Sequence, residues 1–112
     1  KSPLVSIGAH SHCHNLLVQM DPKEAQQSIE KSKGRLEQWT GGPIHSFAYP
    51  NGDFNAQVIK SVVDTGFHCA LTTINRPASM GDNCFILPRI GIGRYDCQEL
   101  FSVRLSGLRS PW

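Results

Sequence analysis

The chain has 112 residues, a length that suits one small domain and is too short for two. Its composition, with 39% hydrophobic and 18% charged residues, is typical of a globular protein and argues against intrinsic disorder. The formal net charge is only +2 and the basic residues are scattered, so the sequence does not predict a nucleic-acid partner. No apolar run approaches the roughly 20 residues that cross a bilayer, so no membrane span is expected.

The first third of the chain predicts a strand, a polar loop and a long helix. Residues 4–9 are strand-like, and a histidine-rich loop follows them. Asp21 and Pro22 form a strong helix start, with Asp21 as the N-cap and Pro22 at the first helical position. The helix is predicted to run to about Trp39 and to end at residues 40–43. Its predicted apolar face consists of Ala25, Ile29, Leu36 and Trp39.

The rest of the chain continues the alternation of strands and helices. A strand over residues 44–49 is followed by a turn at Tyr49 to Asp53 and a helix over 54–65. The near-continuous apolar strand 67–73 is predicted to be covered on both faces. After an irregular loop, strand 85–92 is interrupted by Pro88, and a last amphipathic helix follows Asp96. Asp53 and Asp96 both stand where helix caps are expected.

This order predicts an α/β fold with parallel strands joined by helical crossovers. Four strands cannot close a barrel, since such barrels need about eight. Residues 1–112 therefore form one unit that is either a small open sheet or part of a larger α/β barrel.

Three histidines, His10, His12 and His14, lie within five positions directly after the first predicted strand. Because histidine is the commonest metal ligand, this density predicts a metal site, while the alternative is a polar loop whose imidazoles face water. The turn from Tyr49 to Asp53 follows the next strand along the chain. Ligands collect at the carboxyl ends of parallel strands, so the histidine loop and this turn are expected to share one cleft.

At this point the sequence resembles the polysaccharide deacetylases, the NodB-like or chitin deacetylase family. His10-Ser11-His12-Cys13-His14 fits the family's H-[ST]-x-x-H motif. Phe47 to Asn55 resembles its R-P-P-Y-G segment in the F-A-Y-P-x-G-D form, with Ala48 in place of the motif arginine. Leu87-Pro88-Arg89-Ile90, followed by an amphipathic helix, is similar to the end of some bacterial branches.

The resemblance implies part of a distorted (β/α) barrel of the NodB type that hydrolyses N- or O-acetyl groups of a polysaccharide, of the N-acetylhexosamine type. It implies a divalent metal, usually zinc, held by His10 and His14, with Ser11 bracing the loop. It also suggests the cell envelope or a secreted location. The residues implied to line the sugar groove are Tyr49, Pro50 and Asn51, the Asn51 backbone N–H lying near the developing oxyanion, and Arg89 is a further candidate for substrate binding.

The chain also departs from the family pattern. The family's aspartate pair precedes the histidine motif, and no acidic residue lies among the nine residues before His10, so the catalytic residues would lie upstream of Lys1. The late family histidine has no counterpart, because His45 and His68 are predicted to be structural. The chain is therefore expected to be the C-terminal portion of such a domain, to bind metal weakly and to hydrolyse little. An unpaired sheet edge in such a piece predicts self-association.

Two other readings stay open. His10-x-His12 and His12-x-His14 place side chains on one face of an extended segment, which is the H-x-H arrangement of amidohydrolase or PHP-type metal hydrolases. Alternatively, the chain is a non-catalytic remnant that binds glycan or a partner, or that holds a structural zinc through Cys13.

Overall fold

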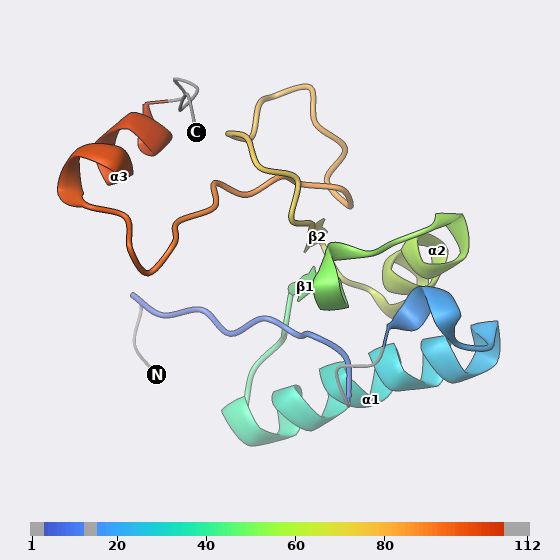
Figure 1. The fold of residues 1–112 in the computed structure, drawn as a ribbon. Coiled ribbons are helices and arrows are strands. Elements are labelled where there is room, and N and C mark those ends of the chain that lie inside the picture. The colour runs from blue at the N-terminus through green and yellow to red at the C-terminus, as the bar shows by residue number, and fades with distance from the viewer. Residues whose placement is uncertain (1–3, 13–15, 107–112) are drawn as a thin grey trace.

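The computed structural model describes residues 4–12 and 16–106 as a small α/β fold with one helical layer against a two-stranded sheet (Figure 1). In chain order the elements are the 3₁₀ helix η1 (Leu17–Gln19), α1 (Pro22–Thr40), β1 (Ser46–Ala48), the 3₁₀ turn η2 (Pro50–Gly52), α2 (Ala56–Thr65), β2 (Cys69–Leu71) and α3 (Gln98–Leu105).

Helix α1 begins and ends where its sequence predicts. The Asp21 side chain accepts a hydrogen bond from the Lys23 backbone N–H at 3.1 Å, which satisfies one of the unpaired donors of the first turn. Gly41 ends the helix in the left-handed conformation, with φ at 73°, and donates to the Glu37 carbonyl. Ala25 and Ile29 are buried as predicted, but Trp39 is 70% exposed, so the predicted apolar face is wrong at its last residue.

Helix α2 begins two residues later than predicted because Asn55 caps it. The Asn55 side chain accepts from the Val58 backbone N–H at 2.9 Å. Asp53 is not the cap; its carboxylate accepts instead from the Asn51 side-chain amide at 3.2 Å. Gly66 takes the left-handed C-cap position, with φ at 97°.

The sheet is parallel, and its register pairs Ser46 with Cys69 and Ala48 with Leu71. Single bridges, Ala9 with Phe47 and Leu71 with Leu87, add an extended segment on each side. Four extended segments therefore run parallel in chain order, as expected. The full strands predicted at 4–9 and 85–92 are wrong, because each shrinks to one bridge; Pro88, which has no N–H, directly follows the second.

The core lies between the sheet and the pair α1 and α2. Phe47 and Ala70 are 0% exposed, whereas the alternate strand residues Cys69 and Leu71 are half-buried. The strand around Ala70 is thus fully covered on one face within the described residues, where two covered faces were predicted. The remaining buried apolar residues are Ala9, Leu17, Ala25, Ile29, Ile44, Tyr49, Val58, Val62 and Phe67.

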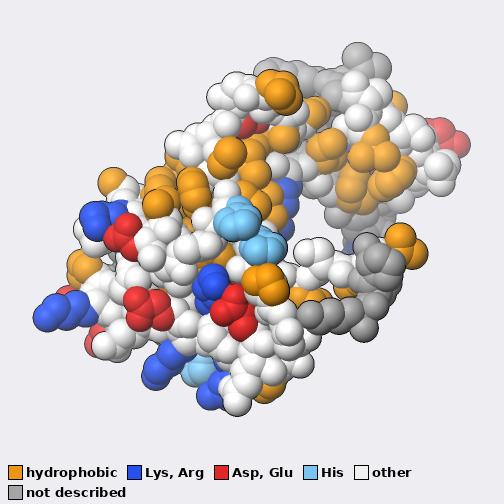
Figure 2. All heavy atoms as spheres, turned by 180° about the vertical axis from the view of Figure 1, so that it is seen from behind, with side chains coloured by type: hydrophobic (Ala, Val, Ile, Leu, Met, Phe, Trp, Pro, Cys, Tyr) orange, Lys and Arg blue, Asp and Glu red, His pale blue; other side chains and the backbone are white. Residues whose placement is uncertain are grey.

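Helix α3 lies away from α1 and α2 (Figure 1) and has no buried side chain. Hydrophobic side chains accordingly remain on the surface of this region, with Leu105 at 53% exposure (Figure 2). Cys97 occupies the N-cap position without a capping side chain, so the predicted cap at Asp96 is wrong. Asp96 accepts instead from the Gly93 N–H and forms an ion pair with Arg104 at 2.9 Å. Among the described residues no helix has the length and apolarity needed to span a membrane.

Candidate functional site

The histidine loop and the Tyr49 turn meet at the carboxyl end of the sheet, as expected. His10 follows the bridge residue Ala9, and its Nδ1 lies 2.7 Å from the carbonyl oxygen of Ala48, the last residue of β1. A carbonyl can only accept, so Nδ1 carries the proton and the lone pair of the neutral ring is on Nε2. This bond fixes the orientation of the ring, in the way that outer hydrogen bonds orient metal-ligating histidines.

The loop after His10 is tied to α1. The His12 backbone N–H donates to the Ser28 hydroxyl at 3.1 Å, and Ser28 is buried on the inner face of the helix. Ser11 takes a left-handed backbone conformation, with φ at 71°, which a serine rarely adopts without surrounding constraint. Its buried hydroxyl has no hydrogen-bond partner within the described chain, so the predicted bracing role of Ser11 stays a prediction. His14, the second predicted metal ligand, lies outside the described residues, as does Cys13.

The turn at residues 49–52 requires its glycine. Asn51 and Gly52 both have left-handed backbones, with φ at 57° and 74°. A Cβ on Gly52 would overlap the Thr73 hydroxyl and lie 2.8 Å from Thr73 Cγ2, so no side chain fits there. Bonds from Gly52 N to the Tyr49 carbonyl and from Asp53 N to the Pro50 carbonyl close the turn. No described residue accepts from the backbone N–H of Asn51, whose side chain is exposed.

The side chains of Tyr49 and Pro50 are buried beneath this turn and do not face solvent. Tyr49 is 0% exposed, and its hydroxyl donates to the Phe85 carbonyl at 2.8 Å. Its ring packs against Phe47 and Phe54, and burial raises the pKa of its phenol to about 12. The Pro50 side chain is also fully buried. The family resemblance implies that both side chains line a sugar groove, but both are buried beneath the turn, and Asn51 is the exposed one of the three residues.

Arg89 is held at the same end of the sheet. Its Nε donates to the Thr72 carbonyl at 2.8 Å, and its backbone N–H donates to the Ile74 carbonyl at 2.9 Å. Thr72 itself is buried, and its hydroxyl donates to the Leu87 carbonyl. The exposed guanidinium is therefore anchored just beyond β2, as a substrate-facing residue would need to be.

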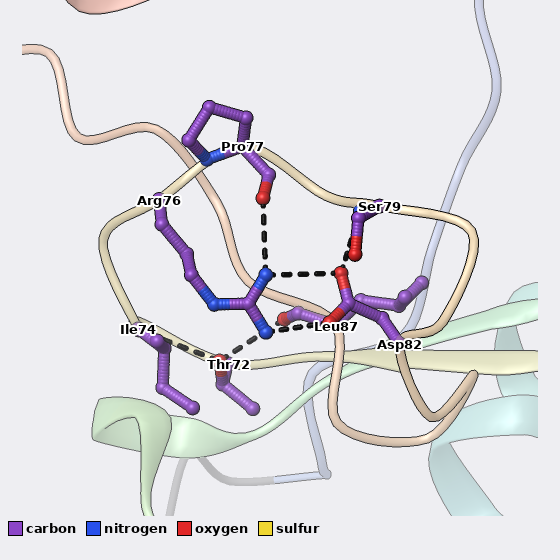
Figure 3. A network of polar contacts seen from close by, with 7 residues as sticks. All are labelled: Thr72, Ile74, Arg76, Pro77, Ser79, Asp82 and Leu87. Carbon is purple, nitrogen blue, oxygen red and sulfur yellow. Dashed lines mark hydrogen bonds and ion pairs between the residues drawn. The ribbon is translucent and has the colours of Figure 1, made fainter. Parts of the chain in front are cut away.

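The loop after β2 contains an organised ion pair that the sequence did not reveal (Figure 3). The Arg76 guanidinium donates to both carboxylate oxygens of Asp82, at 3.1 and 2.5 Å, and to the Pro77 carbonyl. The Ser79 N–H donates to the same carboxylate at 2.6 Å. Arg76 together with this N–H lowers the pKa of Asp82 to about 2. In the sequence, the only indication of this ion pair is an Arg and an Asp six positions apart in a loop that contains Gly and Pro.

A hollow of about 310 Å³ borders His10 and His12, and Arg35 and Trp39 of α1 line its other side. The Arg35 guanidinium lies 5.7 Å from the centre of the Trp39 ring, in cation–π contact. Within residues 4–12 and 16–106, no group of three or more His, Cys, Asp or Glu side chains is arranged to hold a metal ion. The described site thus offers one oriented imidazole, one unpaired backbone donor and one anchored guanidinium.

Comparison with known proteins identifies the fold. The model of the polysaccharide deacetylase family matches residues 1–70. Among solved structures, the Streptococcus pyogenes deacetylase PplD in complex with acetate superposes with a TM-score of 0.82 at 22% identity, over 92% of this chain and 44% of that one. A polysaccharide deacetylase from Bacillus cereus gives 0.77 at 23% identity, over 89% and 32%. IcaB from Ammonifex degensii gives 0.74 at 16%, over 91% and 46%.

The search of curated proteins gives no match. At these identities the structural likeness concerns the fold, and it confirms the predicted α/β arrangement of the NodB-type (β/α) barrel. The chain spans less than half the length of each of the three matched structures.

Proposed function

The chain belongs to the polysaccharide deacetylase family, and on that premise we propose that residues 1–112 are a partial deacetylase domain acting on acetylated polysaccharide. The proposed reaction is hydrolysis of the acetyl amide of N-acetylhexosamine units. The observation that carries this proposal is the 2.7 Å contact between His10 Nδ1 and the Ala48 carbonyl. It joins the two sequence motifs at one end of the sheet and orients the His10 ring as a metal ligand is oriented.

His10 and His14 are proposed to hold a divalent metal of the zinc class. Imidazole nitrogen is a ligand that zinc prefers, and the protonated Nδ1 of His10 leaves Nε2 as the coordinating atom. Such a metal, when bound, supplies polarisation of the acetyl carbonyl and activation of water. The third ligand and the general base belong to the family's aspartate pair, which has no counterpart in this chain before His10.

Asn51 is proposed to bind the developing oxyanion through its backbone N–H. The left-handed turn holds this donor in place, and no described residue occupies it. A preorganised donor of this kind is worth about 10²–10³ in rate where it has been removed in other hydrolases.

Arg89 is proposed to orient the polysaccharide from its position just beyond β2, at the same end of the sheet as the turn. Its Nε donates to the Thr72 carbonyl, which leaves the two terminal nitrogens of the guanidinium as the candidate donors to a ligand. Tyr49 and Pro50 contribute indirectly in this proposal, because their burial fixes the turn that carries Asn51.

The test is zinc binding by calorimetry, because acetate release from N-acetylglucosamine oligomers is expected to be low in a chain with no counterpart of the aspartate pair before His10. His10→Ala is expected to weaken zinc binding at least about a hundredfold, since even loss of a ligand's outer hydrogen bond costs about 10- to 100-fold. His12→Ala is the matched control, because His12 is also exposed and lies in the same loop. It should leave zinc affinity unchanged.

The opposite pattern would contradict the proposal. If His12→Ala abolished zinc binding as strongly as His10→Ala, the H-x-H arrangement of amidohydrolase-type sites would be favoured. Binding of an N-acetylglucosamine oligomer that is unaffected by zinc would favour a glycan-binding remnant.

A further inference from the structure

Two histidines that the proposed deacetylase site does not use lie at the opposite, amino end of the sheet. His45 directly precedes β1, and His68 directly precedes β2. Their rings stack, with centroids 4.2 Å apart and planes inclined by 19°. Both residues are exposed, and Figure 2 shows two histidine side chains adjacent on the surface beside a basic and an acidic group.

The backbone sets the spacing of this pair. The His68 N–H donates to the His45 carbonyl at 2.7 Å, immediately before the register pair Ser46 and Cys69. The two side chains thus leave adjacent parallel segments at the same level. Neither ring is buried, so the contact contributes little to the core and does not confirm the structural role predicted for them.

A carboxylate lies within electrostatic reach of the pair. Glu37 of α1 accepts from the Ile44 N–H at 3.0 Å and from the Lys33 ammonium at 2.7 Å. These two bonds, together with a smaller contribution from the charge of His45, lower the pKa of Glu37 and keep its carboxylate ionised. A cation near His45 would therefore experience a fixed negative charge as well as the Lys33 positive charge that partly offsets it.

We propose that His45 and His68 form a surface site for a divalent transition metal such as Ni²⁺, Zn²⁺ or Cu²⁺, with water completing the coordination. Imidazole is a ligand for these ions, whereas Ca²⁺ and Mg²⁺ prefer oxygen. Two nitrogens bound to one ion at about 2.1 Å lie at most about 4.2 Å apart. The two rings start near one another, with their centroids 4.2 Å apart, and each must turn out of the stack to bind a shared ion. An imidazole binds a metal ion in the plane of its ring, so a shared ion requires both exposed side chains to leave the stacked arrangement.

The site is independent of the proposed zinc site, because the two lie at opposite ends of the strands. With two protein ligands it is an exchangeable site rather than a closed structural one. The described chain offers no third metal-binding side chain close enough to complete it.

Calorimetric titration with NiCl₂ tests the proposal on the chain as it exists. His45→Gln and His68→Gln are each expected to weaken Ni²⁺ binding at the shared site at least tenfold. The double variant should lose no more Ni²⁺ affinity than either single variant. His12→Gln is the matched control at the other end of the sheet and should keep the site. The proposal is overturned if both single variants titrate like the parent, or if their losses add as two independent imidazoles would.

A second measurement needs no variant. Ni²⁺ is paramagnetic, so the ring-proton NMR signals of His45 and His68 should broaden together below one equivalent of metal. Broadening of the signals of one ring without the other, or of neither ring, would contradict the proposal of a shared site. Either failure leaves the deacetylase proposal standing, since that proposal is tested through His10.

Discussion

Helices α1 and α3 are both predicted by the sequence, yet only α1 is part of a core. Ala25 and Ile29 of α1 pack onto the sheet and are at most 2% exposed. Helix α3 carries Leu100, Phe101, Val103 and Leu105 but buries none of them. The predicted amphipathic character of α3 is wrong, because its apolar residues are distributed around the helix, whereas those of α1 gather on one side. The difference teaches that a helix is buried only where its apolar residues form one face that another element can cover.

The largest expected effect comes from replacing a phenylalanine of the core, and a phenylalanine of α3 provides the comparison. Phe47→Ala should lower the free energy of unfolding by about 3–5 kcal/mol, because Phe47 is 0% exposed and its ring contacts Tyr49 and Phe67. Phe101→Ala, at 38% exposure in α3, should cost about 1 kcal/mol or less. Urea unfolding followed by circular dichroism measures both. Equal losses would show that α3 is packed as firmly as the core around β1.

Gly52 lies where the turn at residues 49–52 packs against Thr73. Gly52→Ala should cost about 2–4 kcal/mol, since it combines left-handed strain with overlap on Thr73. Gly41→Ala has the same backbone strain, with φ at 73°, but no atom within 4 Å of the new Cβ, so about 1 kcal/mol is expected. The difference between the two variants in urea unfolding isolates the contact with Thr73. A difference near zero would mean that the Tyr49 turn relaxes freely.

At alkaline pH the packed region should weaken through Tyr49. Its pKa is raised from 10.0 to about 12 by burial, so the neutral phenol is favoured in the fold. The resulting stability is complete below pH 10 and is lost as the pH rises toward 12. Tyr49→Phe should flatten this loss in urea midpoints measured between pH 9 and 12. Tyr95→Phe, at 90% exposure near α3, is the control and should leave the slope unchanged.

At acid pH the loop after β2 should open while the core holds. The pKa of Asp82 is lowered from 3.8 to about 2, chiefly by the hydrogen bond from Arg76. Its contribution is therefore complete above pH 4 and is lost as the pH falls through 2. Hydrogen exchange at the Ser79 amide, which donates to Asp82, reports this opening. Asp82→Asn should remove the protection at neutral pH, whereas Asp64→Asn on α2 should not.

The smallest effect is expected at the end of α3. Leu105→Ala should change the free energy of unfolding by less than about 0.5 kcal/mol, because the side chain is 53% exposed. Amides of α3 should also exchange faster than those of α1. A decrease of more than about 1 kcal/mol in the free energy of unfolding would show that α3 packs against another element and would contradict the contrast with α1.

The sequence predicted the parts of the fold that rest on local chemistry. The cap at Asp21, the end of α1 at residues 40–43 and the order of elements follow from neighbouring residues. It misassigned the caps at Asp53 and Asp96, because a carboxylate can bond a nearby amide outside a helix as readily as a first-turn N–H.

The sequence predicted where in the fold the candidate site lies, but not which of its side chains are exposed. The histidine loop and the turn at 49–52 share the carboxyl end of the sheet, as parallel topology requires. The burial of Tyr49 beneath the turn was not predicted, because which face of a short strand is covered depends on the register and on α2.

By itself, then, the sequence determined which segments become helices and where parallel strands end, because caps, periodicity and crossover geometry act over short distances. Only the tertiary structure decided the contact of His10 with Ala48, the stacking of His45 on His68, the Arg76–Asp82 pair and the isolation of α3. The two histidine contacts depend on strand register, the Arg76–Asp82 pair on the path of the loop, and the position of α3 on which elements lie near it, and no local pattern encodes any of these.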